Sequence, residues 1–365
     1  MKICFPRHTG FAGIGVVVLL FFLASIPLYL VSCGGGGGTS SSGPSYLRGF
    51  GLSPQGFPLP VDPGRWAAFY MEVGGMGRGA AMWNGAWRDD LAGGTDAGTV
   101  PAAGSSLMAA SATYGFTPVF VFGWRSGTTL YLNVPDNSAN DWRNPQARSL
   151  FNSMLVEFAA TYRPPYLFLG NENDFYFEQD NVDYLNWLSF YNSAYDNVKA
   201  ASPSTLVGPV FNFEHIAGSG ALNGWTTPRW GALTLHDANR MDIIGVTVYP
   251  WLNYAFASSV PSEYLAPLFS RIGTKPVAVT ETGWPAENLG GLNPPWNTSP
   301  QEQVDYIPRF FSAIEGKDVR LVNWTFLHFM VDDGTHSPGW KLFGSVSLYD
   351  NSAVRRAAYP AWISR

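Results

Sequence analysis

Charged residues are scarce in this chain. Only 13% of its 365 residues are Asp, Glu, Lys or Arg, and the formal net charge is −5. A nucleic-acid-binding protein needs a clustered positive surface, so this charge balance excludes nucleic acid as a partner. The hydrophobic share of 46% is in turn too high for a disordered chain.

Cysteine is the second scarcity. The two cysteines, Cys4 and Cys33, both lie near the N-terminus. The remainder of the chain therefore has no disulfide, no thiolate nucleophile and no cysteine metal site. Its histidines do not have the paired spacing of a zinc site, and no phosphate loop or Ser-His-Asp motif is evident. We accordingly expect no metal and no cofactor.

Aromatic residues, unlike charged residues, are abundant in this chain. They make up 15% of the chain and include 14 tryptophans. Sugars are uncharged and rich in hydroxyl groups, and their apolar C–H faces lie flat on Trp and Tyr rings, so this composition favours a carbohydrate ligand. The alternative is that the tryptophans simply fill the core.

Residues 1–32 are predicted to be a secretory leader. Lys2 and Arg7 precede an apolar run over 11–22, which is the usual order of a signal peptide. The Leu-Val-Ser sequence directly before Cys33 resembles a bacterial lipoprotein signal. That resemblance implies cleavage before Cys33 and a lipid on its thiol. An uncleaved membrane-spanning helix over 13–31 is the alternative.

A glycine- and serine-rich segment follows this leader. Residues 33–45 have no packing face and are predicted to be a flexible tether from the lipidated Cys33. Residues 46–365 contain no second low-complexity break and are predicted to be one domain. The chain would then be a monomer in the bacterial cell envelope that contacts the membrane through its lipid anchor only.

Short apolar runs alternate with segments of helical periodicity from residue 46 onward. The predicted strands are 47–52, 79–84, 117–122, 166–169, 205–210, 243–249, 276–281 and 320–326. The predicted helices begin near 62 and cover 102–114, 144–162, 182–201, 228–240, 261–272, 299–316 and 353–364. Eight strand-then-helix units predict an α/β fold, a single-domain (β/α)8 TIM barrel. An open doubly wound sheet is the alternative, but it usually carries a glycine-rich phosphate loop after its first strand.

Two glutamates end apolar strands of this predicted barrel. Glu172 follows the fourth strand and Glu281 ends the seventh. A TIM barrel places its active site at the carboxyl ends of its strands, so both would enter the same mouth. Burying a carboxylate costs free energy, so a carboxylate at such a position is expected to be hydrogen-bonded or to take part in catalysis. A retaining glycosidase needs two carboxyls, one as the general acid/base and one as the nucleophile.

The sequence around these glutamates resembles a known enzyme clan. Gly-Asn-Glu-Asn at 170–173 is similar to the strand-four acid/base motif of retaining (β/α)8 glycoside hydrolases. Thr-Glu-Thr-Gly-Trp-Pro at 280–285 is similar to their strand-seven nucleophile motif, especially in arabinogalactan endo-β-1,4-galactanases and plant-type endo-β-1,3-glucanases. Residues 245–251 resemble the clan's strand-six segment, and 343–362 resemble its C-terminal ending.

This resemblance implies a role for five residues. Glu172 would be the general acid/base and Glu281 the nucleophile. Asn171 would hold the 2-hydroxyl of the sugar, and Tyr249 would hold Glu281 in its ionised form. Trp324 would form the floor under the sugar, with a place in the barrel core as its alternative.

Other residues at strand ends are predicted to line a sugar cleft. They are Trp83, Asn84, Trp124, Trp251 and Trp284. The sequence thus predicts a lipid-anchored retaining β-glycoside hydrolase that cuts a poly- or oligosaccharide, with β-1,4-galactan or a β-glucan favoured by the motifs. The alternatives are a non-catalytic carbohydrate-binding lipoprotein on a degenerate barrel and a surface-assembly lipoprotein without a sugar ligand.

Overall fold

The structure is a computed structural model that describes residues 46–88, 100–134, 139–288, 292, 295–332, 334 and 337–365. The predicted leader and tether, with Cys33, lie outside the described residues. Within the described part of the chain, no helix combines the length and the apolarity needed to cross a bilayer.

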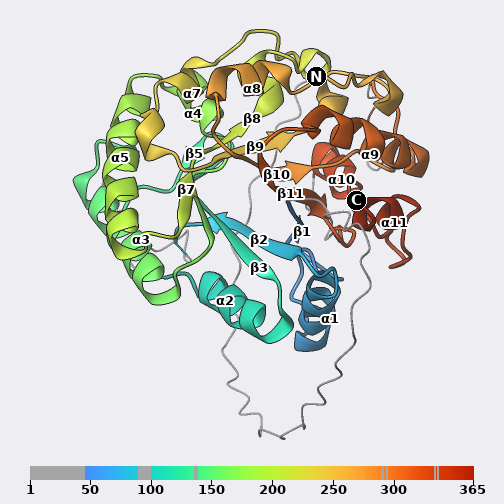
Figure 1. Cartoon of the computed structure of the whole chain (residues 1–365), viewed down its shortest axis with the longest axis horizontal. Helices are drawn as coiled ribbons and strands as arrows, with labels where there is room; N and C mark the ends of the chain where they lie inside the picture. The colour runs from blue at the N-terminus through green and yellow to red at the C-terminus, as the bar shows by residue number, and fades with distance from the viewer. Residues whose placement is uncertain are drawn as a thin grey trace, which may run out of the picture.

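A parallel barrel forms the centre of the molecule (Figure 1). Its strands are β1 (Leu47–Gly51), β2 (Gly79–Ala86), β3 (Thr117–Gly123), β6 (Tyr166–Leu169), β7 (Leu206–Gly208), β8 (Val210–Asn212), β9 (Ile244–Val248), β10 (Val277–Thr282) and β11 (Val319–Phe326). Neighbouring strands pair in the order β7-β6-β3-β2-β1-β11-β10-β9-β8, and every pair is parallel. The predicted TIM barrel is therefore confirmed.

The fifth strand of the barrel is divided. Pro209 separates β7 from β8, and a proline has no N–H with which to continue a ladder. The first half pairs with β6 and the second with β9, so the chain itself closes the barrel at this point. A small antiparallel hairpin of β4 (Arg125–Ser126) and β5 (Thr129–Leu130) follows β3.

Helices surround the strands, with α1 and α2 beside β2 and β3 and α9 on the side of β10 and β11 (Figure 1). They are α1 (Pro63–Gly74), α2 (Ala102–Tyr114), α3 (Pro145–Tyr162), α4 (Asn173–Gln179), α5 (Asp183–Ala201), α6 (Phe213–Ala217), α7 (Gly231–Thr234), α8 (Ala266–Ile272), α9 (Pro300–Ile314), α10 (Pro338–Gly344) and α11 (Ala358–Ile363). One-turn 3-10 helices are η1 (Ala221–Asn223), η2 (Ala238–Arg240), η3 (Pro250–Leu252) and η4 (Ala257–Ser259).

Local sequence explains where these helices begin and end. Asn144 accepts hydrogen bonds from the first-turn N–H groups of α3, and Pro145 occupies its first position. The single helix predicted over 228–240 is wrong, because only α7 and η2 form there. Asp237 accepts the N–H of Asn239 and so starts a new turn instead of continuing the old one.

The core has two layers. The side chains that fill the barrel are Ala80, Met82, Val119, Val121, Phe168, Val210, Ile243, Ala278 and Leu321. A second, larger cluster lies between the strands and the helices. Successive residues of a strand point to opposite faces, so strands such as β2, β3 and β11 contribute buried side chains to both layers in turn.

Candidate active site

The chain turns sharply where Glu172 follows β6. Gly170 has φ of 77° and Glu172 has φ of 49°, so both lie in the left-handed region. Glycine adopts this conformation freely, whereas for glutamate it is strained. Strained residues persist where the surrounding structure imposes the conformation, and they concentrate at functional sites.

Two side chains hold one oxygen of Glu172. Asn212 Nδ2 donates to Oε1 at 3.0 Å, and Thr247 Oγ1 donates to the same atom at 2.8 Å. Burial, together with the nearby charges of Glu281 and Asp174, raises the pKa of Glu172 to about 7. At neutral pH this carboxyl can therefore both give and take a proton.

Glu281, in β10, is held at both oxygens. Tyr249 OH donates to Oε2 at 2.7 Å, and Asn84 Nδ2 donates to Oε1 at 2.8 Å. Burial raises the pKa of Glu281, while hydrogen bonds from Tyr249, Asn84 and Asn171 oppose that rise. Three donors favour the ionised form, so the two carboxyls occupy chemically different environments.

Strand register explains why these groups meet. Asn212 of β8 pairs with Thr247 of β9, and Thr247 pairs with Glu281 of β10. Side chains in one row across parallel strands share a face, and this row lies at the carboxyl ends where a barrel has its mouth.

Five predicted site residues come together in this mouth. Asn84, Tyr249 and Asn171 hydrogen-bond to Glu281, and the charge of Glu281 acts on the neighbouring Glu172. The Oδ1 atom of Asn171 is buried and accepts from no described group. It is thus an acceptor that a substrate hydroxyl can use.

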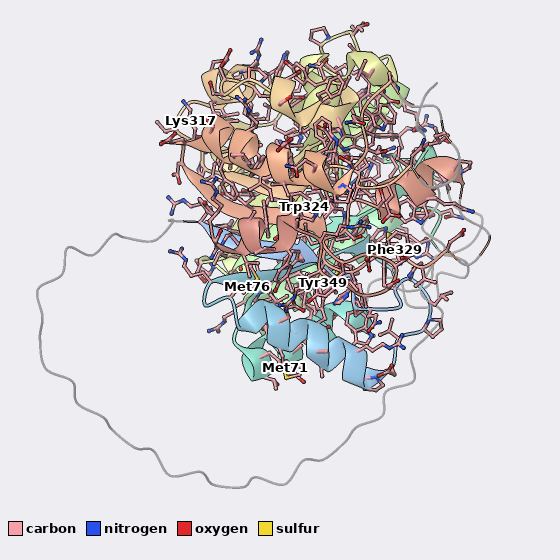
Figure 2. All side chains as sticks on the ribbon, turned by 90° about the vertical axis from the view of Figure 1, so that its right-hand side faces the viewer. Met71, Met76, Lys317, Trp324, Phe329 and Tyr349 are labelled. Atoms are coloured by element: carbon pink, nitrogen blue, oxygen red, sulfur yellow. The ribbon has the colours of Figure 1, made fainter. Side chains whose placement is uncertain are left out.

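The structure places Trp324 away from the mouth, and its prediction as the sugar floor is corrected. Its side chain has no exposed area, and Nε1 donates to the Val346 carbonyl at 2.6 Å. Its ring packs on Trp362 of α11, with a centroid separation of 5.1 Å. Trp324 is labelled in Figure 2. Strand alternation turns Trp324 towards the helices, whereas Asn323 and Thr325 lie on the opposite face of β11.

Four further tryptophans are corrected in the same way. The exposed fractions are 6% for Trp83, 1% for Trp124 and zero for Trp251 and Trp284. Trp83 packs edge-on against a phenylalanine of β3, and Trp124 lies in a cluster of rings from α4 and α5. Trp251 packs on Tyr249, and Trp284 Nε1 donates to a backbone carbonyl at 2.8 Å. The residues predicted to be an aromatic cleft are therefore core.

The sequence interpretation left some functional residues without a role. Thr247 lies inside an apolar strand, so periodicity alone gives no sign that its hydroxyl reaches Glu172. Arg125 donates from its guanidinium to the Glu172 carbonyl at 3.2 Å and lies over the ring of Phe175, 5.3 Å from its centroid. It thereby supports the strained backbone at Glu172.

A third carboxyl is buried beside the pair. Glu214 has no exposed area, and its Oε1 accepts from the Tyr249 N–H at 2.8 Å and from Tyr264 OH at 2.9 Å. Burial raises the pKa of Glu214 to about 7. The group braces the backbone of Tyr249, whose hydroxyl holds Glu281.

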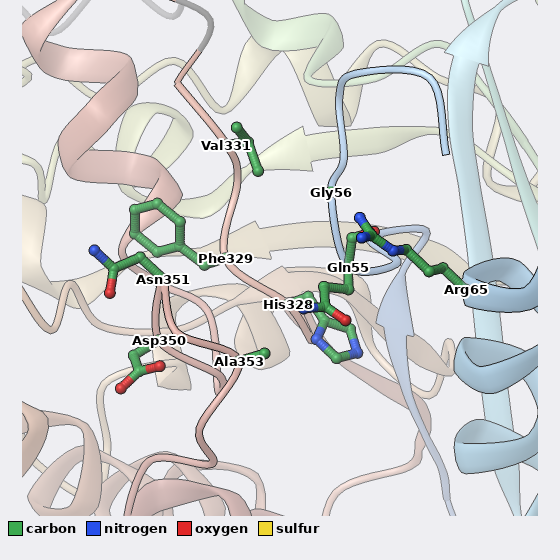
Figure 3. Close-up of a pocket in the computed structure, with 9 residues that line it drawn as sticks. All are labelled: Gln55, Gly56, Arg65, His328, Phe329, Val331, Asp350, Asn351 and Ala353. Atoms are coloured by element: carbon green, nitrogen blue, oxygen red, sulfur yellow. The ribbon is translucent and has the colours of Figure 1, made fainter. Parts of the chain in front are cut away.

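A pocket of about 120 Å³ opens near the ends of β1 and β11 (Figure 3). It is lined by Gln55, Gly56, Arg65, His328, Phe329, Val331, Asp350, Asn351 and Ala353. Gln55 follows β1 and His328 follows β11, so the pocket lies at the same end of the barrel as the glutamates. Amide, guanidinium and carboxylate groups in one recess are suited to binding hydroxyl groups.

No family model matches the sequence, and no curated protein sequence matches it. Solved structures do match. A GH5_18 protein from Streptomyces cattleya in complex with Manβ1-4GlcNAc has a TM-score of 0.63 and 14% identity, covering 86% of this chain and 79% of that one. An exo-β-1,4-mannosidase from Opitutaceae bacterium strain TAV5 has a TM-score of 0.62 and 14% identity, covering 87% and 58%.

A third match is a family 39 glycoside hydrolase from Bacteroides cellulosilyticus WH2. Its TM-score is 0.57 at 15% identity, covering 87% of this chain and 62% of that one. The chain thus spans less than two thirds of two of these three proteins. All three are similar to it over most of its length, and at such identities the similarity shows the TIM-barrel fold.

Proposed function

We propose that this protein is a retaining β-glycoside hydrolase acting on a β-linked poly- or oligosaccharide. The observation that carries the proposal is one mouth with two buried carboxyls that accept different sets of hydrogen bonds. Glu172 has a pKa near neutrality, and Glu281 accepts three hydrogen bonds that favour its ionised form. Double displacement requires one carboxyl that donates and accepts a proton and one ionised carboxylate that attacks the anomeric carbon. The similar folds of three glycosidase-clan structures are consistent with it.

In the first step, Glu172 gives its proton to the glycosidic oxygen while a Glu281 oxygen attacks the anomeric carbon. The C–O bond to the leaving sugar breaks, and a glycosyl ester forms on Glu281. In the second step, Glu172 takes a proton from water, which attacks the same carbon and releases the carboxylate. Asn171 would hold the 2-hydroxyl through its side-chain amide, a contact that strengthens in the oxocarbenium-like transition state.

A β-1,4-galactan or a β-glucan cut within the chain is the substrate we favour. The motifs around Glu281 and over 245–251 support this choice. The pocket near β1 and β11 supplies polar groups for sugar units beyond the cleaved bond. Because the predicted tryptophan platforms are buried, polar contacts would carry more of the binding than stacking.

The catalytic domain would be held at the bacterial cell envelope by a lipid on Cys33. The Leu-Val-Ser-Cys sequence and the glycine and serine residues that follow it support this arrangement. The length of the 33–45 segment would let a monomeric barrel reach polysaccharide near the membrane.

An assay of residues 46–365 against a panel of β-glycans tests the activity. We expect Glu172→Gln and Glu281→Gln to lower kcat at least about 1000-fold on the substrate that wild type accepts, since general acid catalysis alone contributes roughly 100- to 10,000-fold. The matched control is Glu157→Gln, an exposed residue of α3, which should retain wild-type kcat.

Two results would overturn the proposal. If wild type and both glutamate variants are inactive on every glycan yet bind one equally, the protein is a carbohydrate-binding lipoprotein. If NMR of the first product shows the inverted anomer, the reaction is not a double displacement.

A further inference from the structure

A continuous chain of polar contacts runs from Glu172 towards solvent. Asn212 donates from Nδ2 to Glu172 and from its backbone N–H to Asp174 Oδ1, the latter at 2.8 Å. The other oxygen of Asp174 lies 2.6 Å from His215 Nδ1. His215 Nε2 lies 2.9 Å from Glu178 Oε2, and Glu178 also pairs with an arginine.

Two short helices supply this chain. Asp174 and Glu178 are four residues apart on α4 and therefore share one face. That face meets α6, which carries His215 and which Asn212 caps. Because both helices directly follow strand ends, the network lies immediately behind the barrel mouth.

The inner members of this network are sealed from water. Asn212, Asp174 and His215 have no exposed area. Phe175 stacks on the His215 ring at a centroid separation of 4.2 Å, and Trp225 meets it edge-on at 5.2 Å. Removing two ionisable side chains from water is costly, and a hydrophobic pair of similar volume often stabilises a fold as well. Their presence here calls for a role beyond packing.

Glu178 forms the outer end of the network. Its burial would raise the pKa, but hydrogen bonds from His215 and Arg229 lower the pKa of Glu178 below its usual value. An ionised carboxylate only accepts, so His215 Nε2 donates to Glu178. Asp174 Oδ2 lies 2.6 Å from His215 Nδ1, so the imidazole has a carboxyl neighbour at each of its two nitrogens.

Asn212 is held at both its backbone and its side chain. Its backbone N–H donates to Asp174, and its Oδ1 accepts the backbone N–H of His215 at 3.0 Å, so Nδ2 must face Glu172. Glu172 Oε1 then receives two donors, from Asn212 and Thr247. No described residue hydrogen-bonds to Oε2, so a proton on this carboxyl resides on Oε2, the atom free to meet a glycosidic oxygen.

We propose that Asp174, His215 and Glu178 are positioning residues that hold Asn212 against Glu172 and so assign the transferable proton to Glu172 Oε2. This inference rests on the proposed glycosidase function. It adds three residues, none of which touches the substrate, to the parts of the molecule that determine acid catalysis.

The kinetic experiment compares two aryl glycosides of the accepted sugar. A phenyl leaving group needs protonation, whereas a dinitrophenyl group leaves without it. For His215→Gln we expect kcat/KM on the phenyl glycoside to fall at least about 10-fold, a fraction of the roughly 100- to 10,000-fold contribution of general acid catalysis. On the dinitrophenyl glycoside it should fall less than about 3-fold.

His236→Gln is the matched control. His236 is also a buried histidine with a tyrosine hydroxyl partner, 3.1 Å away, but it belongs to the helix layer near α5. It should change kcat/KM on the two glycosides by the same factor.

A double variant gives a second test. In a Glu172→Gln background, His215→Gln should cause no further loss of kcat/KM on the phenyl glycoside, because the two residues would act in series. An equal effect on both glycosides, or a fully additive double variant, would overturn the inference.

A readout without turnover separates this inference from the proposed function. The Glu172 carboxyl can be titrated by carbon-13 NMR. In His215→Gln, Asp174 loses its imidazole partner and holds the Asn212 backbone less firmly, so the hydrogen bond from Asn212 to Glu172 should weaken and the pKa of Glu172 should rise; His236→Gln should leave that pKa unchanged. If wild type hydrolyses nothing but this shift occurs, the glycosidase proposal fails and the positioning network stands. If the titration is unchanged, the network is refuted. Glu178→Gln, at the partly exposed outer end of the network, should also raise the pKa of Glu172, by a smaller amount than His215→Gln. It replaces His215→Gln in this experiment if that variant does not fold.

Discussion

At the scale of single residues, Glu214 shows how burial alters a carboxyl. The Tyr249 N–H and Tyr264 OH both donate to its Oε1. Oε2 is buried without a described partner. The protonated form is therefore favoured, and the pKa of Glu214 rises from the usual 4.5 to about 7.

This rise makes Glu214 a source of pH-dependent stability. The folded protein binds the proton more tightly than the unfolded chain, so the stabilisation is complete below about pH 4.5 and is lost as pH rises through about 7. In wild type, the free energy of unfolding should decline between about pH 4.5 and 7 by at most on the order of 3 kcal/mol because of Glu214. In Glu214→Gln this part of the decline should be absent. Urea unfolding at a series of pH values measures this effect. Curves for wild type and variant that run parallel would contradict it, and Glu157→Gln, on the exposed face of α3, provides the baseline.

At the scale of elements, the start of α9 differs from its sequence signature. Ser299, Pro300 and Glu302 look like a reciprocal capping box. Ser299 Oγ does accept the Glu302 N–H at 3.1 Å. The Glu302 carboxylate instead accepts the N–H of Ala257 at 2.7 Å and the amide of Asn297 at 2.9 Å. Glu302 thereby ties α9 to the chain around η4.

The serine cap should still stabilise α9. Ser299→Ala removes the acceptor for one first-turn N–H, and we expect the free energy of unfolding to fall by about 1 kcal/mol. Ser312→Ala, at an exposed position in the last turn of the same helix, should change it by less than about 0.5 kcal/mol. Chemical denaturation of the two variants compares them directly. If the Ser299 variant is as stable as the Ser312 variant, tertiary contacts alone stabilise the N-terminal end of α9.

At the scale of the whole molecule, closure of the barrel unites residues far apart in sequence. Asn84, Tyr249 and Glu281 come from β2, the end of β9 and β10, yet they share one hydrogen-bonded group. The leader and tether are separate from the barrel in sequence and are proposed to determine where it works.

The proposed anchor can be tested in the full chain. Labelled palmitate supplied to a bacterial host should enter wild type and Cys4→Ser, but not Cys33→Ser. Cys4 is the matched control because it is the other cysteine and lies before the proposed cleavage point. An unlabelled but membrane-bound wild type would favour the uncleaved helix over residues 13–31.

Much of the fold could be predicted from local sequence. Alternating apolar runs and helix signals located all eight barrel strands, and the ranges of 102–114 for α2 and 166–169 for β6 match the structure. Periodicity did not reveal the break at Pro209, because a run of apolar residues gives no sign of where strand pairing stops, and it joined α7 and η2 into one helix. The divided strand still occupies a single place in the barrel.

The sequence by itself determined the barrel and the two glutamates at its mouth, because strand periodicity and the strand-end rule depend on the order of residues alone. Only the tertiary structure decided which way each aromatic strand-end residue points. Trp324 and Trp284 are buried because helices cover that face of their strands. The raised pKa of Glu172 and the network behind it were equally beyond the sequence, since burial and the nearby Glu281 and Asp174 carboxyls cause that rise and only folding brings them together.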